Sequence, residues 1–277
     1  MLQTLREKGK GMKTAKINLV FFSPTGSTKS VLERMGKKWT DDYEATVREI
    51  NLTRAEPDQD EYSFGDDELV FFGVPSYGGR VPETAAKRFG RMRGSNTPAV
   101  LVVTYGNRAY DDTFLELRHI VRQNGFVPMA AIAAVTEHSI FHDIAKGRPD
   151  DDDRKEIWNF AGQIQKALDE IDDIAGGVKL ALPGNRPYRE YKGVPLKPKP
   201  GKQCNGCGVC ARECPVGAIS LENPKKTEEE RCISCMRCVH VCPQHSREVG
   251  GLLYQMAQKK LKKLCAEAKK NEIFLPE

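Results

Sequence analysis

The sequence predicts an α/β protein in which a doubly wound parallel sheet of five strands precedes a small α+β domain rich in cysteine. Two observations lead to this prediction. Between residues 16 and 171, short apolar runs alternate with segments of helical periodicity, which is typical of a parallel sheet with helices on both faces. Between residues 204 and 243, cysteines recur at regular spacing. A length of 277 residues suits one ordinary domain and one small domain.

The composition argues against several classes of protein. The net charge of +5 is too small to indicate nucleic-acid binding. No apolar run approaches the roughly 20 residues that a membrane-spanning helix needs. Residues 1–14 are basic and lack the apolar segment of a secretion signal. We therefore expect a flexible basic tail at 1–14 and a cytoplasmic protein with no transmembrane segment.

The first expected strand, at 16–23, is an apolar run that ends at serine and proline. The turn that follows it contains Ser23, Pro24, Thr25, Gly26, Ser27 and Thr28. A helical pattern comes next, and the amides at a helix N-terminus attract anions, while Gly26 lets the backbone approach one closely. The turn therefore predicts a phosphate site, with simple helix capping as the alternative. A P-loop lysine and a Gly-x-Gly-x-x-Gly pattern are both missing.

The same turn is similar to the loop that binds the FMN phosphate in flavodoxins. The shared pattern is Ser-x-Thr-Gly-x-Thr directly after the first strand. The resemblance implies an FMN site in which the phosphate is bound by Ser23, Thr25, Gly26, Ser27 and Thr28.

The end of the third expected strand carries residues that suit a flavin ring. The second strand is expected at 43–52 and the third at 68–74. The third leads into a loop of Pro75, Ser76, Tyr77, Gly78 and Gly79. Flavodoxin-like sheets bind their ligand at the carboxyl ends of strands. Tyr77 offers a ring for stacking and the glycines allow close approach, while a glycine turn with a surface tyrosine is the alternative.

The fourth expected strand, at 98–104, follows a helix at 82–91 and leads into a third loop of this kind. Its candidate flavin contacts are Thr104, Tyr105, Gly106, Asn107 and Tyr110. A helix at 114–124 and a fifth strand at 127–135 come next. The loop after that strand contains His138, which we consider as a hypothetical catalytic proton donor. A packing or surface role is the alternative for this histidine.

A helix at 157–171 closes the first domain, which we assign to residues 15–175. Residues 176–200 are rich in Gly, Pro and Lys and are expected to form a linker. Some of its side chains are candidates to anchor it along the first domain: Leu180, Leu182, Tyr188 and Tyr191.

The cysteines form two copies of the motif Cys-x2-Cys-x2-Cys-x3-Cys-Pro. With this spacing, three thiolates hold one cubane cluster and the fourth ligates the other cluster. One [4Fe-4S] cluster is therefore predicted on Cys204, Cys207, Cys210 and Cys242. The second is predicted on Cys214, Cys232, Cys235 and Cys238. Disulfides suit a secreted chain, and zinc sites usually lack the third cysteine and the proline, so both alternatives fit less well.

Residues 201–248 resemble a bacterial-type ferredoxin domain with two [4Fe-4S] clusters. After it, residues 249–277 are expected to form a basic amphipathic helix that packs on the protein itself, with a membrane surface or a partner as the alternative. Its apolar side would consist of Leu253, Met256, Leu261, Leu264 and Ala268. Cys265 would lie on that side as a core residue.

Together these features resemble the flavodoxin/ferredoxin fusion proteins of anaerobic bacteria and archaea. The resemblance implies FMN, two [4Fe-4S] clusters and electron transfer. It does not fix a partner. We expect redox proteins such as ferredoxins, reductases or oxidoreductases, and basic patches near the clusters would steer acidic ones.

Two other classes of function are weighed against an electron carrier. One is an FMN-dependent oxidoreductase that reduces a small acceptor such as a quinone, a nitro compound or free flavin. The carrier is preferred because no acid, base or substrate pocket is evident in the sequence. The other class is a regulatory protein, for which no DNA-binding element is visible.

Overall fold

The computed structural model describes residues 16–54, 61–171, 174 and 178–277. The basic tail expected at 1–14 lies outside the described residues. Among the helices described, none is both long enough and apolar enough to cross a membrane.

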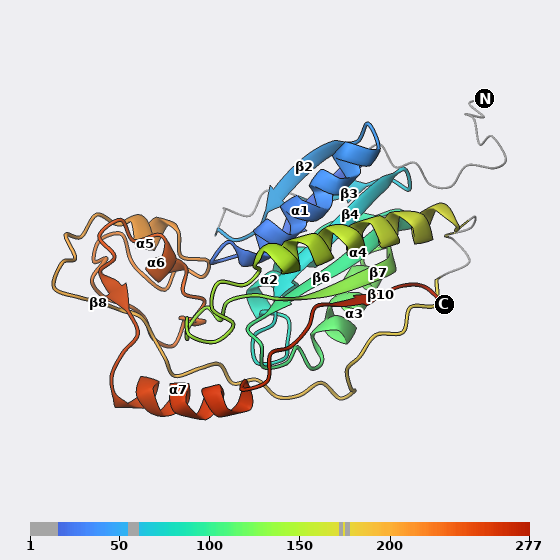
Figure 1. Ribbon diagram of the computed structural model, residues 1–277. Helices are drawn as coiled ribbons and strands as arrows, with labels where there is room; N and C mark the ends of the chain where they lie inside the picture. Colours follow the sequence, from blue (N-terminus) through green and yellow to red (C-terminus); the bar gives the residue numbers. More distant parts are fainter. Residues whose placement is uncertain (1–15, 55–60, 172–173, 175–177) are drawn as a thin grey trace.

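Parallel strands form the centre of the first domain (Figure 1). They are β1 (Lys16–Phe21), β2 (Thr46–Asn51), β4 (Glu68–Pro75), β6 (Thr97–Tyr105) and β7 (Phe126–Val135). In space they follow the order β2, β1, β4, β6, β7, which is the doubly wound order of flavodoxin-like folds. The strands β1, β4, β6 and β7 are largely apolar because both faces are covered, and every residue of β6 is buried. The edge strand β2 differs, because only Ile50 is buried in it. The predicted fold class is thus confirmed.

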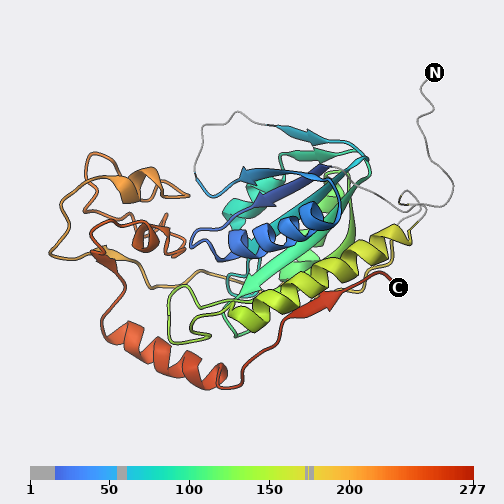
Figure 2. The ribbon, with the colours of Figure 1, turned by 45° about the horizontal axis from the view of Figure 1, so that its top comes forward.

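Helices cover both faces of this sheet. Their bounds are α1 Ser27–Asp42, α2 Glu83–Phe89, α3 Thr113–Gln123 and α4 Asp151–Asp169. Helices α1 and α4 lie side by side on one face (Figure 2), with Trp39 and Ile157 in the core beneath them. Helices α2 and α3 cover the other face through Phe89 and Phe114. A separate parallel pair consists of β3 (Tyr62–Phe64) and β5 (Met92–Gly94).

A further strand, which the sequence did not predict, lies at the edge of the main sheet. Strand β10 (Glu272–Phe274) pairs antiparallel with β7, and Ile273 lies opposite Ile132. It belongs to residues 249–277, for which only a helix was expected. Helix α7 covers Leu252–Leu264, and the chain then runs along the first domain to the sheet edge (Figure 1). The C-terminal segment therefore completes the sheet.

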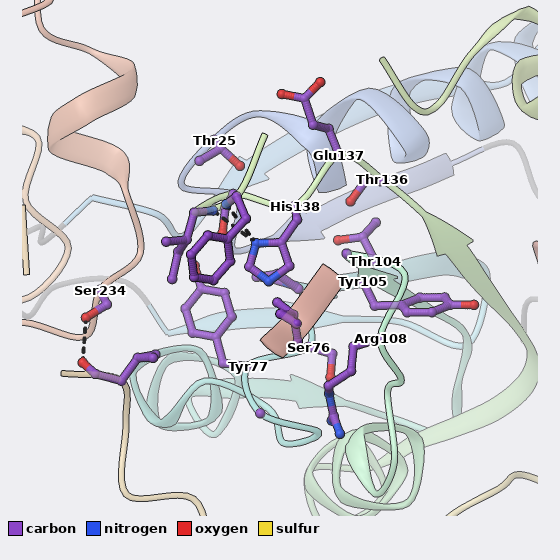
Figure 3. A pocket seen from close by; sticks show the side chains of 18 of the residues that line it. Thr25, Ser76, Tyr77, Thr104, Tyr105, Arg108, Thr136, Glu137, His138 and Ser234 are labelled. Atoms are coloured by element: carbon purple, nitrogen blue, oxygen red, sulfur yellow. Dashed lines mark hydrogen bonds between the residues drawn. The ribbon is translucent and has the colours of Figure 1, made fainter. Parts of the chain in front are cut away.

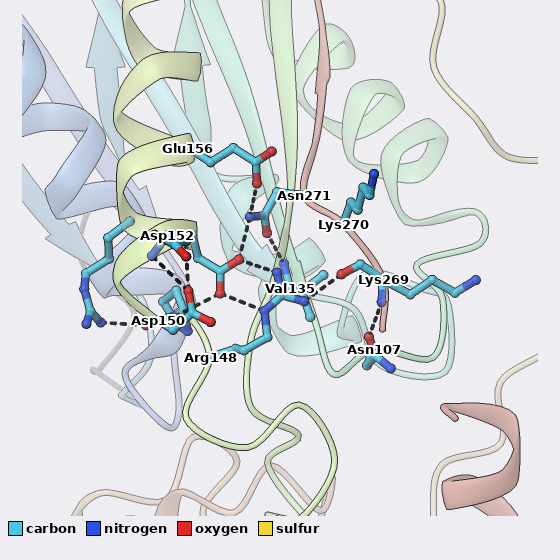
Figure 4. Close-up of polar contacts among 12 residues, drawn as sticks. Asn107, Val135, Arg148, Asp150, Asp152, Glu156, Lys269, Lys270 and Asn271 are labelled. Atoms are coloured by element: carbon cyan, nitrogen blue, oxygen red, sulfur yellow. Dashed lines mark hydrogen bonds and ion pairs between the residues drawn. The ribbon is translucent and has the colours of Figure 1, made fainter. Parts of the chain in front are cut away.

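Asn271 fixes this returning segment just before β10 (Figure 4). Its Oδ1 accepts from the Val135 amide at 2.8 Å. Its Nδ2 donates to Asp153 Oδ1 at 2.9 Å and to Glu156 Oε2 at 2.6 Å. Because Asn271 is buried, these bonds satisfy its amide group and join the segment to both β7 and α4.

Helix α7 packs on the protein, through a side that coincides only in part with the one predicted. Its Tyr254, Ala257 and Leu261 contact the buried Phe141 and Ile144. Of the residues expected to face inward, Leu261 does so and Cys265 is half-buried beside it. The others are exposed, and they are Leu253, Met256, Leu264 and Ala268. The inward side is set by the ring of Tyr254, whose centroid lies 5.1 Å from that of Phe141. The periodicity of the aliphatic residues did not reveal this aromatic contact.

The segment expected as a linker, 176–200, lies extended along the first domain over its described part. Leu180 is 5% exposed, and its burial confirms it as an anchor. Asp112, just before α3, accepts from the amides of Asn185 at 2.8 Å and Arg189 at 2.7 Å. Burial alone would raise the pKa of Asp112. The hydrogen bonds from these amides lower the pKa by more than burial raises it, so that it lies below its ordinary value. The linker is thus held by a charged carboxylate.

The cysteine-rich domain lies beyond the carboxyl ends of the parallel strands (Figure 1). Its elements are α5 (Val209–Arg212), α6 (Arg237–His240), β8 (Lys199–Pro200) and β9 (Arg247–Glu248). Arg88 of α2 joins the two domains, because its guanidinium donates to the carbonyl oxygens of Pro215 and Leu52, each at 2.6 Å.

Candidate functional site

A cavity of about 350 Å³ lies at the carboxyl ends of β1, β4 and β6, between the two domains (Figure 3). Residues predicted to bind a cofactor that lie in its wall are Ser23, Thr25, Ser27, Thr28, Pro75, Ser76, Tyr77, Gly78, Thr104, Tyr105 and Gly106. His138 lines it as well. Loops that are far apart in the sequence meet here because parallel strands present their carboxyl ends at one edge of the sheet.

The turn after β1 forms one end of this cavity. Gly26 is the N-cap of α1 and has a φ of 84°, a left-handed conformation that glycine adopts without strain. Because Gly26 has no side chain, it cannot cover the first amides of the helix. Ser23 Oγ accepts from the Lys29 amide at 3.0 Å, so the capping alternative also holds in part. The positive end of this 16-residue helix suits an anion at the turn.

Paired hydroxyl groups tie the strand ends together. Thr28 Oγ1 and Thr104 Oγ1 lie 2.8 Å apart, and both side chains are buried. Ser76 Oγ and Thr113 Oγ1 also lie 2.8 Å apart. These bonds fix the turn after β1 to the end of β6, and the end of β4 to the start of α3.

The loop after β4 is a tight turn, closed by backbone bonds between Tyr77 and Arg80 at 3.0 Å and 3.2 Å. Gly78 has a φ of 60°, and a Cβ at this position would lie 2.1 Å from the ring of Tyr191. Glycine is therefore required by the turn and by the linker ring above it. Tyr77 lines the cavity (Figure 3), and burial raises the pKa of its hydroxyl, so that it stays neutral.

His138 lies against Gly106, where a Cβ would be 2.7 Å from the imidazole Cδ2. Its Nδ1 accepts from the amides of Ile140 at 3.1 Å and Phe141 at 3.2 Å, which leaves the proton on Nε2. Burial lowers the pKa of His138 to about 4, so the ring is neutral at pH 7. These contacts suit a fixed hydrogen-bond donor, and the catalytic role considered from the sequence stays a hypothesis.

Some predicted flavin contacts lie outside the cavity wall, namely Gly26, Gly79, Asn107 and Tyr110. Asn107 is buried and donates to the carbonyl oxygens of Cys265 and Glu267, each at 3.0 Å. Tyr110 donates to Glu272 Oε1 at 2.9 Å. Both side chains hold the C-terminal segment in place, so their polar groups are already occupied. The two glycines shape their turns instead of lining the cavity.

Residues from outside the main sheet complete the wall, and most of them were missed from the sequence. They include Tyr191 and Leu196 of the linker, Ile233 and Ser234 of the second cysteine motif, and Leu261 of α7. Tyr191 and Leu261 carried a signal, because Tyr191 was expected to anchor the linker and Leu261 to lie on the apolar side of the C-terminal helix. The positions of the others depend on how the domains dock, which local patterns do not contain.

Two smaller cavities lie inside the cysteine-rich domain. The first is lined by Cys204, Cys207, Cys210 and Cys242. The second is lined by Cys214, Cys232, Cys235 and Cys238. Each combines three cysteines of one motif with the fourth of the other, which is the grouping expected from the sequence. Within the described ranges, no three His, Cys, Asp or Glu side chains form a site for a single metal ion.

The surroundings of these cavities suit a negatively charged cluster. The amide of Ala218 donates to Cys214 Sγ at 3.2 Å, and that of Ser246 donates to Cys242 Sγ at 3.4 Å. Arg247 is 2% exposed and lines the first cavity, and its Nε has no partner among the described residues. Amide donors and a buried guanidinium both stabilise the charge of thiolate-bound iron and sulfide.

The second cavity adjoins the cavity between the domains. Ile233, which lies between Cys232 and Cys235 in the sequence, lines both. No residue that lines the first cavity also lines the cavity between the domains. Cys207 of the first cavity is exposed. The two cysteine groups thus differ in depth and in their distance from the main cavity.

Comparison with known proteins gives a match for the cysteine-rich domain. Residues 203–249 match the family described as 4Fe-4S dicluster domain. Over 47 residues, the chain is 43% identical to a component of the ion-translocating oxidoreductase complex of Methanosarcina acetivorans. The matched stretch covers 17% of this chain and 18% of that protein, so the chain spans less than a fifth of the relative.

Solved structures resemble the remaining part of the chain at low sequence identity. A Streptococcus pneumoniae TIGR4 flavodoxin is 13% identical, with 55% of this chain and 99% of that chain covered and a TM-score of 0.38. A flavodoxin from the domain Archaea is 15% identical, with coverage of 55% and 98% and a TM-score of 0.39. The apo form of NADH:FMN oxidoreductase (EMOB) is 15% identical, with coverage of 57% and 92% and a TM-score of 0.40.

The chain therefore joins a flavodoxin-like α/β domain, defined by its strand order, to a C-terminal 4Fe-4S dicluster domain. This is the domain arrangement of a flavodoxin/ferredoxin fusion. Domains of the second kind carry iron–sulfur clusters that transfer electrons.

Proposed function

We propose that this protein relays electrons between two [4Fe-4S] clusters and an FMN bound in the cavity between the domains. The observation that carries the proposal is the position of Ile233, which lines both that cavity and the second cysteine cavity. One short loop therefore separates the second cluster site from the flavin site. Each cluster passes one electron at a time, whereas bound FMN stores one or two.

The proposed cluster ligands follow the two cysteine cavities. The first cluster would be held by Cys204, Cys207, Cys210 and Cys242. The second would be held by Cys214, Cys232, Cys235 and Cys238. Four thiolates for each cluster match the number that a cubane requires.

The chain's own residues divide the flavin site into a polar end and an apolar end. At the polar end, the turn at 23–28 and the first amides of α1 would bind the phosphate. At the other end, Tyr77 and Gly106 would lie beside the ring, and His138 offers a donor at Nε2. Leu261 of α7 closes this end and excludes water.

The different depths of the cysteine cavities give the relay an order. The second cluster would lie next to the flavin, and the first would exchange electrons with an external redox protein at the exposed Cys207. Ferredoxins, reductases or oxidoreductases are the proposed partners. Joining both cofactor sites in one chain keeps donor and acceptor at high effective concentration.

Exposed cations around the first motif suit an acidic partner. Lys202, Arg212, Lys225 and Lys226 are exposed, and none forms an ion pair with another described residue, whereas the neighbouring Glu222 offsets part of their charge. Arg212 lies next to the exposed Cys207, because its Nη2 donates to the Cys207 carbonyl at 3.4 Å. We expect the rate of electron exchange with an acidic ferredoxin to fall as ionic strength rises. A rate that does not change with salt would remove this part of the proposal.

The cofactor content tests the proposal. Protein prepared without oxygen is expected to contain about eight irons and to bind about one FMN per chain, measured by iron, sulfide and flavin analysis with a visible spectrum. Fully loaded clusters with no binding of added FMN would contradict the flavin site. Bound FMN without iron would contradict the cluster sites.

A second candidate is an FMN-dependent oxidoreductase that reduces a small acceptor. The observation that favours it is the apolar wall formed by Phe141, Leu196 and Leu261, which suits a flat aromatic compound such as a quinone. A screen of quinones, nitro compounds and free flavin separates the two functions. Fast turnover of one acceptor with slow electron exchange with redox proteins would favour the enzyme.

A further inference from the structure

We propose that the loop of the second cysteine motif is a structural part of the flavin site, so that assembly of the second cluster and binding of FMN stabilise each other. The inference rests on the proposed function, because it takes the cavity between the domains as the FMN site. The first motif does not reach that cavity, so its cluster is expected to have no such effect.

The two motifs have the same spacing but differ at corresponding positions. Gly206 corresponds to Ser234, and Gly208 corresponds to Met236. All of these residues have a left-handed backbone, with φ of 76° and 75° at the glycines and 54° and 61° at Ser234 and Met236. Glycine adopts this conformation freely, whereas it is strained for serine and methionine. Such strain persists where a side chain has a task that glycine cannot perform.

The task of Ser234 is to join the cluster loop to the wall of the flavin cavity. Its side chain is 4% exposed and lines that cavity (Figure 3). The hydroxyl donates to the Val194 carbonyl at 3.1 Å and accepts from Lys197 Nζ at 3.2 Å. Val194 belongs to the linker and lines the same cavity. A glycine at position 234 would form neither bond, and the linker would keep only the bond from Lys197 Nζ to the Cys232 carbonyl at this point.

The same loop also reaches the expected phosphate turn. Arg237 follows the cluster ligand Cys235 by two positions, and its Nη1 donates to the Pro24 carbonyl at 3.2 Å. The guanidinium also forms an ion pair with Glu213. The corresponding residue of the first motif is Val209, whose side chain has no hydrogen-bond donor. Ligation of Cys235 to iron would therefore fix the loop that supports the turn.

Thermodynamic linkage turns these contacts into a prediction. If the ligated loop supports the flavin site, loss of the second cluster lowers the affinity for FMN. The coupling is reciprocal, so bound FMN must also raise the affinity of the chain for the second cluster by the same factor.

A pair of matched variants tests the role of Ser234. Ser234→Gly removes the hydroxyl and relieves the backbone strain, so iron content should stay at that of the parent chain. The FMN Kd, measured anaerobically from the quenching of FMN fluorescence, is expected to rise about three- to tenfold through the lost hydrogen bonds. Gly206→Ser makes the opposite change in the first motif, where no atom lies within 4 Å of the added Cβ. This control is expected to leave the FMN Kd unchanged.

A second pair tests the role of the cluster. Cys235→Ser is expected to raise the FMN Kd about tenfold or more, and Cys207→Ser to change it less than about twofold. In the parent chain, saturating FMN should raise the chelator concentration that removes the iron of the second cluster at equilibrium. If the parent binds FMN but Ser234→Gly and Cys235→Ser bind it equally tightly, the inference is overturned and the proposed function stands. Equal weakening by Cys207→Ser and Cys235→Ser would also overturn it, whereas a parent chain that binds no FMN contradicts the proposed function itself.

Discussion

Glycines beneath aromatic rings shape the wall of the flavin site. Gly78 lies under the ring of Tyr191, and Gly106 lies under the imidazole of His138. An added Cβ would come within 2.1 Å of the first ring and 2.7 Å of the second, so neither position accepts a side chain without moving the ring. Only Gly78 also needs a left-handed backbone. The rings of Tyr191 and His138 therefore leave no room for a side chain at Gly78 and Gly106.

Gly106→Ala tests this steric constraint. The new methyl group would push His138 out of position, and we expect the free energy of unfolding to fall by about 1–3 kcal/mol. Urea unfolding followed by tryptophan fluorescence measures it, because Trp39 and Trp158 both lie in the first domain. The control Gly250→Ala adds a methyl group where no atom lies within 4 Å and should change the stability by less than about 0.5 kcal/mol. Equal stabilities of the two variants would contradict the steric account.

His138 predicts a pH dependence of stability. Burial lowers its pKa from 6.5 to about 4 in the folded protein, so the unfolded chain binds the proton more tightly. The contribution of His138 to the free energy of unfolding is therefore fully present above pH 6.5 and is lost as the pH falls toward 4. Between pH 7 and pH 5 the parent should lose about 1–2 kcal/mol more than His138→Gln, measured by the same fluorescence assay. Identical pH profiles would show that His138 is solvated in the folded protein.

At the scale of the elements, the short strand β10 depends on contacts outside its own sequence. Its pairing with β7 covers only three residues, and Asn271 supplies the bonds that lead the chain to it. Asn107 holds the same segment two residues before Asn271, because its Oδ1 accepts from the Lys269 amide at 2.8 Å. Side-chain amides thus replace regular secondary structure along this part of the chain.

Asn271→Ala tests the attachment of β10. Loss of the amide leaves the Val135 amide and the Asp153 carboxylate without these partners, and we expect the free energy of unfolding to fall by about 2–3 kcal/mol. Hydrogen exchange at the Ala133 amide, which faces β10 as the Val135 amide does, should speed up in the same variant because the edge of β7 becomes exposed. The neighbouring control Lys270→Ala alters an exposed side chain. It should change neither the free energy of unfolding nor the exchange rate. Slow exchange at Ala133 in Asn271→Ala would refute the anchoring role.

The parallel strands were predictable from the sequence, whereas β10 was not. The strands β1, β4, β6 and β7 are largely apolar runs between turn residues, and burial on both faces requires such a run, whereas β2 is an exposed edge strand. The three residues of β10 have no pattern of their own, because their pairing is decided by Asn271 and the sheet edge. Helix α7 was expected from its periodicity, but the contact of Tyr254 with Phe141 sets which side of the helix packs on the protein.

At the scale of the whole molecule, the site is made by docking. The loops at the strand ends were predicted as one cofactor site because parallel topology brings them together. The walls from the linker, the second motif and α7 could not be predicted, since nothing local in Leu196, Ser234 or Leu261 shows what they face. Arg88 and Arg237 hold the domains together through backbone carbonyls, which any sequence provides. The contacts that set the distance between the cofactor sites therefore leave little trace in the sequence.

Arg88→Gln tests this docking. The variant loses the guanidinium bonds to Leu52 and Pro215 but keeps every predicted cofactor ligand. We expect unchanged iron content and flavin reduction that is slower by at least about twofold, because the docked arrangement is less populated. Lys87→Gln on the same helix removes an exposed side chain paired only with Glu83 and serves as the control. An unchanged rate in Arg88→Gln would show that this contact does not position the domains.

Stopped-flow absorbance during anaerobic reduction by an excess of a low-potential donor, such as reduced ferredoxin, tests the relay most directly. The relay predicts that flavin absorbance falls together with cluster absorbance in the parent chain, and that flavin reduction slows strongly in Cys235→Ser, which lacks a proposed ligand of the inner cluster. Flavin that stays oxidised while the clusters are fully reduced, or that is reduced equally fast in Cys235→Ser, would contradict it.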